Sequence, residues 1–373
     1  MSGAAPRLSD RQRISWLRLI RTENVGPATF RDLINRFGSA ETAIEMLPEL
    51  MRSGGATRLP RIPSVGEAED EMERARRAAV QFVAIGEASY PPYLRRMPHP
   101  PPLLAVKGET SVFALPPVAM VGARNASLAG IRMARNLAAE IGRAGHAVVS
   151  GLARGIDTAV HEGSLATGTI AVFAGGLDQP FPAENVALAE EISAKGGALV
   201  SEMPFGWEPR AKDFPRRNRI IAGLSLGLVV VEAAQRSGSL ISARLAGEMG
   251  RLVFAVPGSP LDPRAAGANS LLKQGAILVT EARDVLEQIA PLAGASVAPV
   301  VSAEEPPDFS ATPPPVDDDR DKVLECLGPT PCGVDEIIRH TGLHPAQVFM
   351  ILLELDLAGR LERHAGGQVS LLM

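Results

Sequence analysis

The sequence predicts an α/β protein: a doubly wound parallel sheet flanked by a small all-α N-terminal domain and a C-terminal winged-helix domain. Three observations support this. Apolar runs alternate with amphipathic helices through the middle of the chain, helical periodicity dominates its start, and its end has helices followed by two short strands. We expect four segments: a helical domain over 1–75, the sheet over 76–290, a flexible linker over 291–318 and the winged helix over 319–373.

The composition limits the class of protein. A chain of 373 residues with 36 glycines and 46% hydrophobic content suits two or three globular domains. The net charge of −4 does not attract nucleic acid, so DNA binding would require a local basic cluster. We find no signal peptide and no apolar run of the roughly 18 residues that span a membrane, and therefore expect a cytoplasmic protein without a membrane partner. Cys326 and Cys332 cannot form a disulfide framework or a zinc ribbon.

The first 75 residues have the periodicity of a helical bundle. Helices are predicted over 10–20 and 28–37, and Gly26 and Pro27 fall where a tight turn starts the second one. This arrangement resembles a helix-hairpin-helix or sterile-alpha-motif bundle. Such a hairpin binds DNA phosphates or serves as a docking module, and the sequence leaves both roles open. A charged helix over 67–79 then leads into a strand over 82–85.

The core is organised around residues 118–163, which contain two successive β-loop-α units. The strand Val118–Val121 stops at Gly122, and an amphipathic helix follows the loop. The strand Ala147–Val149 stops at the loop SGLARGID, where Asp157 is the predicted helix cap. Further apolar strands are predicted over 103–106, 170–173, 198–200, 227–231, 252–255 and 276–279.

The loops after these strands carry cations. Because parallel strands point the same way, their following loops gather at one edge of the sheet, where open α/β sheets bind ligands. The basic residues that we expect near this edge are Arg124, Arg154, Lys212, Arg216, Arg217, Arg219 and Arg236.

Three loop motifs suit anions. GARNASLAG lacks the dinucleotide spacing, but the backbone N–H groups of Gly122 to Ser127, with Arg124, Asn125 and a helix N-terminus, suit phosphate. In KDFPRRNR the only acidic residue among the basic ones is Asp213, and the Asn218 side chain can hydrogen-bond a nucleobase or the backbone. In QRSGSL, the residues Ser237, Gly238 and Ser239 open a helix. They form either an anion site or an ordinary cap made by Ser239.

We expect no catalytic residue, metal or cofactor. Ser150, Asp157 and His161 invite comparison with a hydrolase triad, but the motif G-x-S-x-G is missing, so Asp157 and His161 are interpreted as a pair that orders the loop. No Walker lysine follows a glycine loop, which disfavours ATP hydrolysis.

The last segment has the pattern of a winged helix-turn-helix. Helices over 320–327, 334–340 and 346–357 precede two short strands joined by residues 365–367. Its acids outnumber its bases, which favours protein docking over DNA reading.

Taken together, the motifs resemble those of the DNA-processing protein A (DprA/Smf) family over residues 80–290. In chain order they are VAMVGARNAS, SGLARGIDTAVHEGSL, TIAVFAGGLD, SEMPFG, FPRRNRIIAGLS, VVVEAAQRSGSL, and AVPGS followed by GANSLLKQGA. The flanking domains also agree with that family. Ala123 and Phe181 stand where the family commonly has Ser and Tyr, and neither change removes a charge.

The resemblance implies an extended Rossmann-like fold that binds single-stranded DNA, usually as a homodimer. It also implies that the protein protects incoming DNA and loads the RecA recombinase in natural transformation, in competition with single-strand-binding protein. Arg124, Arg154, Arg217, Arg219 and Ser237 to Ser239 match the family's conserved pocket.

Two other classes compete with this interpretation. The lysine-decarboxylase-like nucleotide phosphoribohydrolases have a similar sheet and the motif P-G-G-x-G-T-x-x-E. Here Ser242, Ala243 and Arg244 surround the place of the catalytic glutamate, and Glu248 is further along. A transcriptional regulator would need a basic recognition helix, and the helix 346–357 has none.

Overall fold

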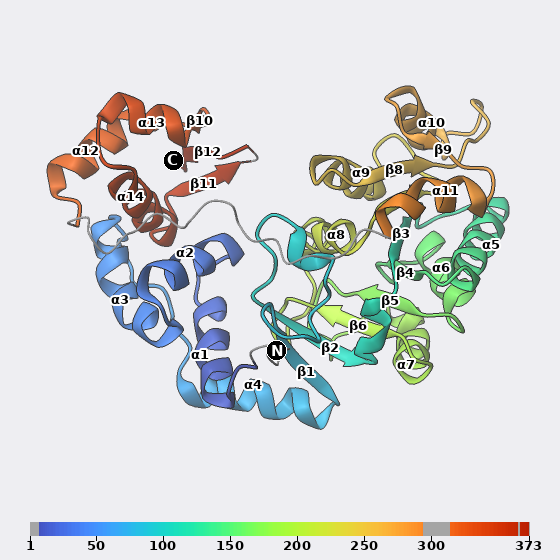
Figure 1. The fold of residues 1–373 in the computed structure, drawn as a ribbon, viewed down its shortest axis with the longest axis horizontal. Helices are drawn as coiled ribbons and strands as arrows, with labels where there is room; N and C mark the ends of the chain where they lie inside the picture. Colours follow the sequence, from blue (N-terminus) through green and yellow to red (C-terminus); the bar gives the residue numbers. More distant parts are fainter. Residues whose placement is uncertain (1–6, 294–313, 365, 373) are drawn as a thin grey trace. The chain divides into compact units, whose positions relative to one another are not determined.

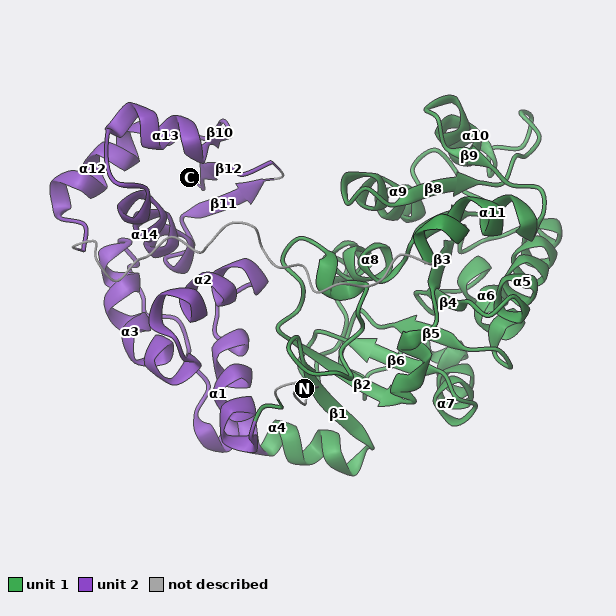
Figure 2. Cartoon of the chain, in the orientation of Figure 1, with its two compact units in different colours: residues 1–8, 70–299 green, residues 9–69, 300–373 purple. Residues whose placement is uncertain are grey.

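A computed structural model describes residues 7–293, 314–364 and 366–372 (Figure 1). The chain divides into two compact units, Met1–Leu8 with Asp70–Pro299 and Ser9–Glu69 with Val300–Met373 (Figure 2). Most of the predicted linker lies outside the described residues. Its two ends are helical rather than extended, because α11 (Ala282–Ala293) continues to Ala293 and α12 (Asp317–Cys326) begins at Asp317. No helix in the described ranges is long and apolar enough to cross a membrane.

The first unit contains a nine-stranded sheet in the order β1-β2-β6-β5-β4-β3-β7-β8-β9. Strands β3 to β9 are parallel, and the chain winds outward from β3 in both directions, which confirms the doubly wound fold. The strands are β1 (Val80–Ala84), β2 (Leu103–Gly108), β3 (Pro117–Val121), β4 (Ala147–Ser150), β5 (Thr169–Val172), β6 (Ala198–Ser201), β7 (Gly227–Val230), β8 (Leu252–Ala255) and β9 (Ile277–Leu278).

The prediction of parallel strands is wrong at one edge of the sheet. β1 pairs antiparallel with β2, and β2 pairs antiparallel with β6. The connections explain this difference. A parallel crossover usually needs a helix, whereas the segments before and after β2 contain only the short 3₁₀ turns Leu94–Arg96 and Thr110–Ala114.

Helices cover both faces of the sheet (Figure 1). Along β3, Val118 and Met120 pack against α5 (Leu128–Arg143), α6 (Ile156–Ser164) and α11, whereas Ala119 and Val121 belong to the core with α8 (Asp213–Leu224), α9 (Gly238–Glu248) and α10 (Ala266–Lys273). Successive side chains of a strand point to opposite faces, so an uninterrupted apolar run is what a sheet covered on both sides requires. The helix α7 (Val186–Ala194) connects β5 to β6 in the chain and packs against both strands.

The second unit joins helices from both ends of the chain. It contains α1 (Asp10–Arg21), α2 (Pro27–Phe37), α3 (Ala40–Ser53) and the winged helix, which consists of α12, β10 (Cys332–Gly333), α13 (Val334–Thr341), α14 (Pro345–Leu357), β11 (Leu361–His364) and β12 (Gln368–Leu371). Gly26 caps α2 and Pro27 is its first residue, as predicted. The sequence prediction did not include α3, whose pattern is interrupted by Pro48. A further helix, α4 (Val65–Arg77), leads to β1.

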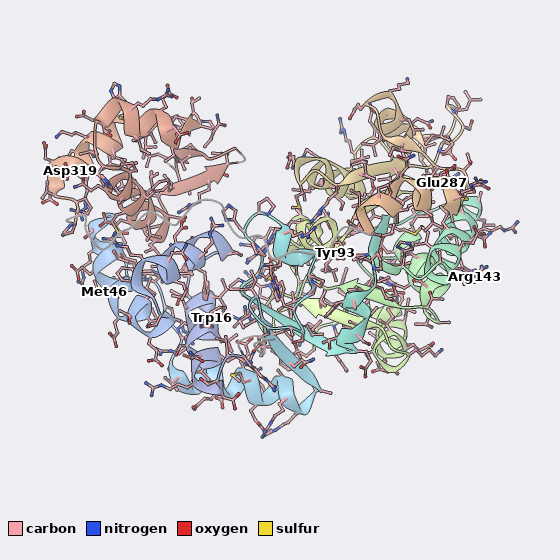
Figure 3. The ribbon with its side chains drawn as sticks, viewed as in Figure 1. Trp16, Met46, Tyr93, Arg143, Glu287 and Asp319 are labelled. Carbon is pink, nitrogen blue, oxygen red and sulfur yellow. The ribbon has the colours of Figure 1, made fainter. Side chains whose placement is uncertain are left out.

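Helix α14 has apolar residues on two sides. Val348, Ile351 and Leu352 pack in the winged helix's own core. Met350, Leu353 and Leu357 pack against α1, α2 and α3, and Trp16 and Met46, labelled in Figure 3, border the same cluster. Thr29 donates a hydrogen bond of 2.9 Å to Asp356, and Asn24 donates one of 3.1 Å to the carbonyl of Leu357. The helix that would read DNA in a winged helix is therefore largely buried within this unit.

Candidate nucleic-acid interface

The loops at the carboxyl edge of the sheet enclose a groove at the switch point between β3 and β7. It has a volume of about 800 Å³, and a hollow of about 480 Å³ adjoins it. Arg124, Phe181, Phe214 and Arg217 line both, so we treat the two as one site and call it the groove. Of the predicted residues, the structure brings together Gly122, Arg124, Asn125, Arg154, Arg217, Asn218, Arg236, Ser237, Gly238 and Ser239.

Arg217 is a buried cation at this site. Its side chain lies over Gly151, where an added Cβ would overlap the guanidinium group. The residue is 6% exposed, and its buried Nε has no hydrogen-bond partner in the part of the chain that the structure describes. Desolvation lowers the pKa of Arg217 to about 10, with Asp157 opposing and Arg124 adding to that shift, so the group keeps its charge at pH 7. A buried charged donor without a direct partner is costly, and an anion in the groove would reduce that cost.

Aromatic rings lie beside the cations. The guanidinium carbon of Arg124 is 5.2 Å from the centre of the Phe214 ring. Phe214 meets Phe181 edge to face at 5.6 Å, and Phe181 is 50% exposed. The groove thus offers positive charge for phosphate together with apolar ring faces on which bases can stack.

The remaining cations of the groove are exposed. Arg154 forms an ion pair of 3.1 Å with Glu184, and both side chains are more than half exposed, so water and salt weaken this pair. Arg236 follows β7 on the loop that leads to α9. Ser237 is the cap of α9 and accepts a hydrogen bond from the backbone N–H of Ser239, so the alternative in which Ser239 is an ordinary cap does not hold.

The structure contradicts the prediction of an open phosphate cradle at the start of α5. Ser127 caps this helix, and both its backbone N–H and its hydroxyl donate to the Glu232 carboxylate, at 3.1 and 2.6 Å. A carboxylate of the protein itself therefore occupies the helix N-terminus that we had expected to bind phosphate. Ser127 lines a separate hollow beside Glu232 rather than the groove.

Two predicted cations of α8, Arg216 and Arg219, and the residue before the helix, Lys212, also lie outside the groove lining. Glu202, whose side chain is only 6% exposed, pairs with Arg216 at 2.9 Å and with Arg219. Arg219 also donates to the carbonyl of His99 at 3.1 Å. Lys212 is exposed just before α8. Residues three apart share a helix face while the next position turns about 100° away, which separates Arg216 and Arg219 from Arg217.

Asp157 and His161 do not form the predicted pair. Gly155 is the cap position of α6, and the Asp157 carboxylate instead accepts hydrogen bonds from the backbone of Gly151 and Ala153, at 3.2 and 3.3 Å. His161 bonds the Thr169 hydroxyl at 2.8 Å, and burial lowers the pKa of His161 to about 3. Asp157 therefore orders this loop without His161, together with Asn185, which donates to the carbonyl of Leu152 at 2.9 Å.

Phe181, Phe214 and Gly151 are among the residues of this site that the sequence did not predict, as is Arg264, a further cation of the groove lining. Phe181 was noted as a departure from the family, but neither it nor Phe214 was included in the predicted site. An apolar ring between prolines, as in QPFPAEN, is a signal for an exposed aromatic residue. Gly151 was seen only as a loop glycine, although its missing side chain makes the space for Arg217.

The fold and the groove define a Rossmann-like protein with a cationic, aromatic-lined site at its switch point. The sequence matches the family described as DNA recombination-mediator protein A over residues 81–290, with a DprA-like N-terminal HHH domain over 10–74 and a DprA winged helix domain over 305–367. Protein Smf of Escherichia coli (strain K12) is 41% identical over 288 residues, 76% of this chain and 75% of Smf.

Two solved structures are similar. DprA from Streptococcus pneumoniae has a TM-score of 0.57 and 33% identity, covering 75% of this chain and 93% of that one. DprA from Helicobacter pylori, reported for its single-stranded DNA binding mode, has a TM-score of 0.52 and 27% identity, covering 57% and 97%. The chain belongs to the DprA family.

Proposed function

We propose that the groove binds single-stranded DNA. The observation that carries this proposal is Arg217, a buried guanidinium without an ion-pair partner among the described residues, at a site lined by Phe181 and Phe214. Asp157 acts on Arg217 electrostatically but is hydrogen-bonded to backbone N–H groups, so phosphate can supply a direct partner, because a guanidinium holds phosphate through two parallel hydrogen bonds. Exposed rings stack on bases, which are accessible only where the strands are unpaired. The single-stranded DNA binding reported for the Helicobacter pylori relative supports the same function.

Duplex DNA is expected to bind less well. A duplex hides its base faces, so it would use the cations but not the rings. The helix that could enter a major groove, α14, has no basic residue and packs against α2 and α3. We therefore expect a preference for single strands with little sequence bias.

We infer a mediator role from the family. In this proposal the protein acts in the cytoplasm as a homodimer that protects incoming single strands in natural transformation. It competes with single-strand-binding protein and loads RecA recombinase onto the strand. The match to a family described as DNA recombination-mediator protein A supports this role.

Binding across a range of salt concentrations tests the first proposal. We expect the anisotropy of a labelled oligonucleotide to report tighter binding of the single strand than of a duplex of equal length. If four or five phosphates are neutralised, log K should fall against log salt with a slope of about −3. Equal affinity for the duplex, or a slope near zero, would contradict the proposal.

The mediator role needs a separate assay. RecA-dependent ATP hydrolysis on DNA coated with single-strand-binding protein should start sooner when this protein is present. An Arg217→Ala variant should lose that effect if loading depends on the groove. An unchanged lag with wild-type protein that binds DNA normally would contradict the loading role alone.

The hydrolase alternative lacks a suitable carboxylate. Glu248, at the end of α9, pairs with Arg244 at 2.7 Å and does not line the groove. Asp157 is the one carboxylate among the described residues lining the groove, and two backbone N–H groups hold it. We expect no release of free base when the protein is incubated with AMP, and release at an enzymatic rate would favour the hydrolase.

A further inference from the structure

The loop from β6 to α8 carries an aromatic–cation pair that does not line the groove. The guanidinium carbon of Arg210 is 4.6 Å from the centre of the Trp207 ring. Arg210 is exposed and forms no ion pair with any described residue, whereas Trp207 is partly buried. Arginine and tryptophan in this arrangement attract each other, and Arg210 is the solvent-exposed member of the pair.

Hydrogen bonds fix this pair in place. Trp207 donates its indole N–H to Asp213 at 2.9 Å, and the backbone N–H of Arg210 donates to the same carboxylate oxygen at 2.9 Å. The carbonyl of Trp207 accepts from the backbone N–H of Gly176 at 2.9 Å, and the preceding residue, Gly206, donates its backbone N–H to Asp178 at 2.7 Å. Because the fold already orders the loop, a ligand would not have to supply that ordering energy.

The pair adjoins the groove along the chain. Asp213, which holds both Trp207 and Arg210, is the residue before Phe214, and both Phe214 and Ala211 line the groove. Lys212 lies between them and is exposed. The residues next to the groove residues Ala211 and Phe214 along the chain therefore supply a ring, a guanidinium and an ammonium group.

We propose that Trp207 and Arg210, with Lys212, form a second nucleotide subsite on the same DNA strand outside the groove. This inference rests on the proposed function of the groove. A base stacks on the exposed side of the pair, since both arginine planes and aromatic rings accept stacked bases. The adjacent ammonium of Lys212 contacts the phosphate of that nucleotide as a point charge.

Tryptophan fluorescence of the full chain tests the subsite directly. The chain has two tryptophans, and Trp16→Phe leaves Trp207 as the only reporter. Oligothymidylates of about 4 and about 16 nucleotides bracket the site sizes of single-strand binders. We expect both to bind, as followed by anisotropy, but only the longer one to quench Trp207. In the chain that keeps Trp16, the part of the fluorescence quenching that disappears in Trp207→Phe measures the same contact between the DNA and Trp207.

Affinity measurements separate the subsite from general charge. Arg210→Ala should weaken the longer oligonucleotide about tenfold and leave the shorter one unchanged. Arg244→Ala removes an equal charge from an exposed position outside the groove. It should change the affinity for the two oligonucleotides by the same factor. If Trp207 emission is unchanged at saturation, or Arg210→Ala weakens both lengths equally, the subsite is wrong and the groove proposal stands. If wild-type protein binds neither oligonucleotide, the proposed function itself is wrong.

Discussion

Helix α8 carries arginines on two faces, and their surroundings differ. Arg217 lies in the groove without a paired carboxylate among the described residues, whereas Arg216 and Arg219, on the other face, share the buried Glu202. The three residues are almost adjacent in FPRRNR, so local sequence does not separate them. The charge available to a ligand therefore depends on which cations are already paired with carboxylates of the protein.

The N-termini of α5 and α9 show the same contrast. At the start of α5, Ser127 donates its hydroxyl to the Glu232 carboxylate. The start of α9, with Ser237 and Gly238, lines the groove instead. A carboxylate at a helix N-terminus occupies the position that a phosphate would take. An acid of the protein therefore removes the start of α5 from the predicted anion site, whereas Gly122, Arg124 and Asn125 of the same motif still line the groove.

The largest effect is expected from removing the cation in the groove. Arg217→Ala should weaken single-strand binding by about 1.5 to 3 kcal/mol, the range for a charge-assisted contact. Arg216→Ala, on the opposite face, should cost no more than about 0.5 kcal/mol, because its charge is already paired. Anisotropy titrations of both variants measure the difference.

A control is needed because Arg217 also opposes the buried charge of Asp157. Arg217→Lys retains the charge without the planar fork, so it should fold and recover only part of the affinity. Equal losses of affinity for Arg217→Ala and Arg216→Ala would show that pairing with Glu202 does not decide which arginines bind DNA.

The space that holds Arg217 can be changed without touching the arginine. A methyl group at Gly151 would overlap the guanidinium, so Gly151→Ala should displace it and cost about 1 to 2 kcal/mol of binding. Gly247→Ala is the matched control, because Gly247 is outside the groove lining and an added Cβ there meets no atom of the described residues within 4 Å. Normal binding by Gly151→Ala, with circular dichroism of folded protein, would mean that the position of Arg217 is not critical.

Removing the acid tests the other face of α8. Glu202→Gln should release Arg216 and Arg219 from their shared partner and strengthen DNA binding by less than about 1 kcal/mol. The added net charge should also make the salt slope steeper. The variant should be less stable, since a buried carboxylate loses two charged contacts. Weaker binding at unchanged salt slope would indicate that Glu202 acts through the shape of the groove.

Much of the fold could be predicted because it depends on local pattern. Continuous apolar runs such as 118–121 and 227–231 indicate strands buried on both faces, and parallel order places their loops on one edge. The antiparallel direction of β2 was missed, although the lack of a helix between 85 and 103 was visible. Helix α3 was missed for another reason, since its apolar face is buried partly by α14 from the other end of the chain.

The site was less predictable because it depends on long-range packing. Glu232 and Ser127 are separated by 105 residues, and nothing near Ser127 reveals the contact. Phe181 comes from a loop and Phe214 from the first turn of α8, and only the folded sheet places their rings together. The sequence therefore predicts which cations lie near the edge of the sheet. Which of them can bind a ligand depends on where the fold places the acidic side chains and the aromatic rings.

The smallest effect is expected near neutral pH, where Arg217 remains charged. Its pKa is depressed to about 10 because burial disfavours the charged form, and phosphate binding requires that form. Affinity should therefore stay level from pH 7 to about 9 and fall as the pH rises through 10, where the unbound guanidinium begins to lose its proton. An oligodeoxyadenylate is the suitable ligand, since its bases do not ionise in this range. Arg217→Ala should bind more weakly throughout and lack the decline, and the same decline in this variant would assign the titration to another group.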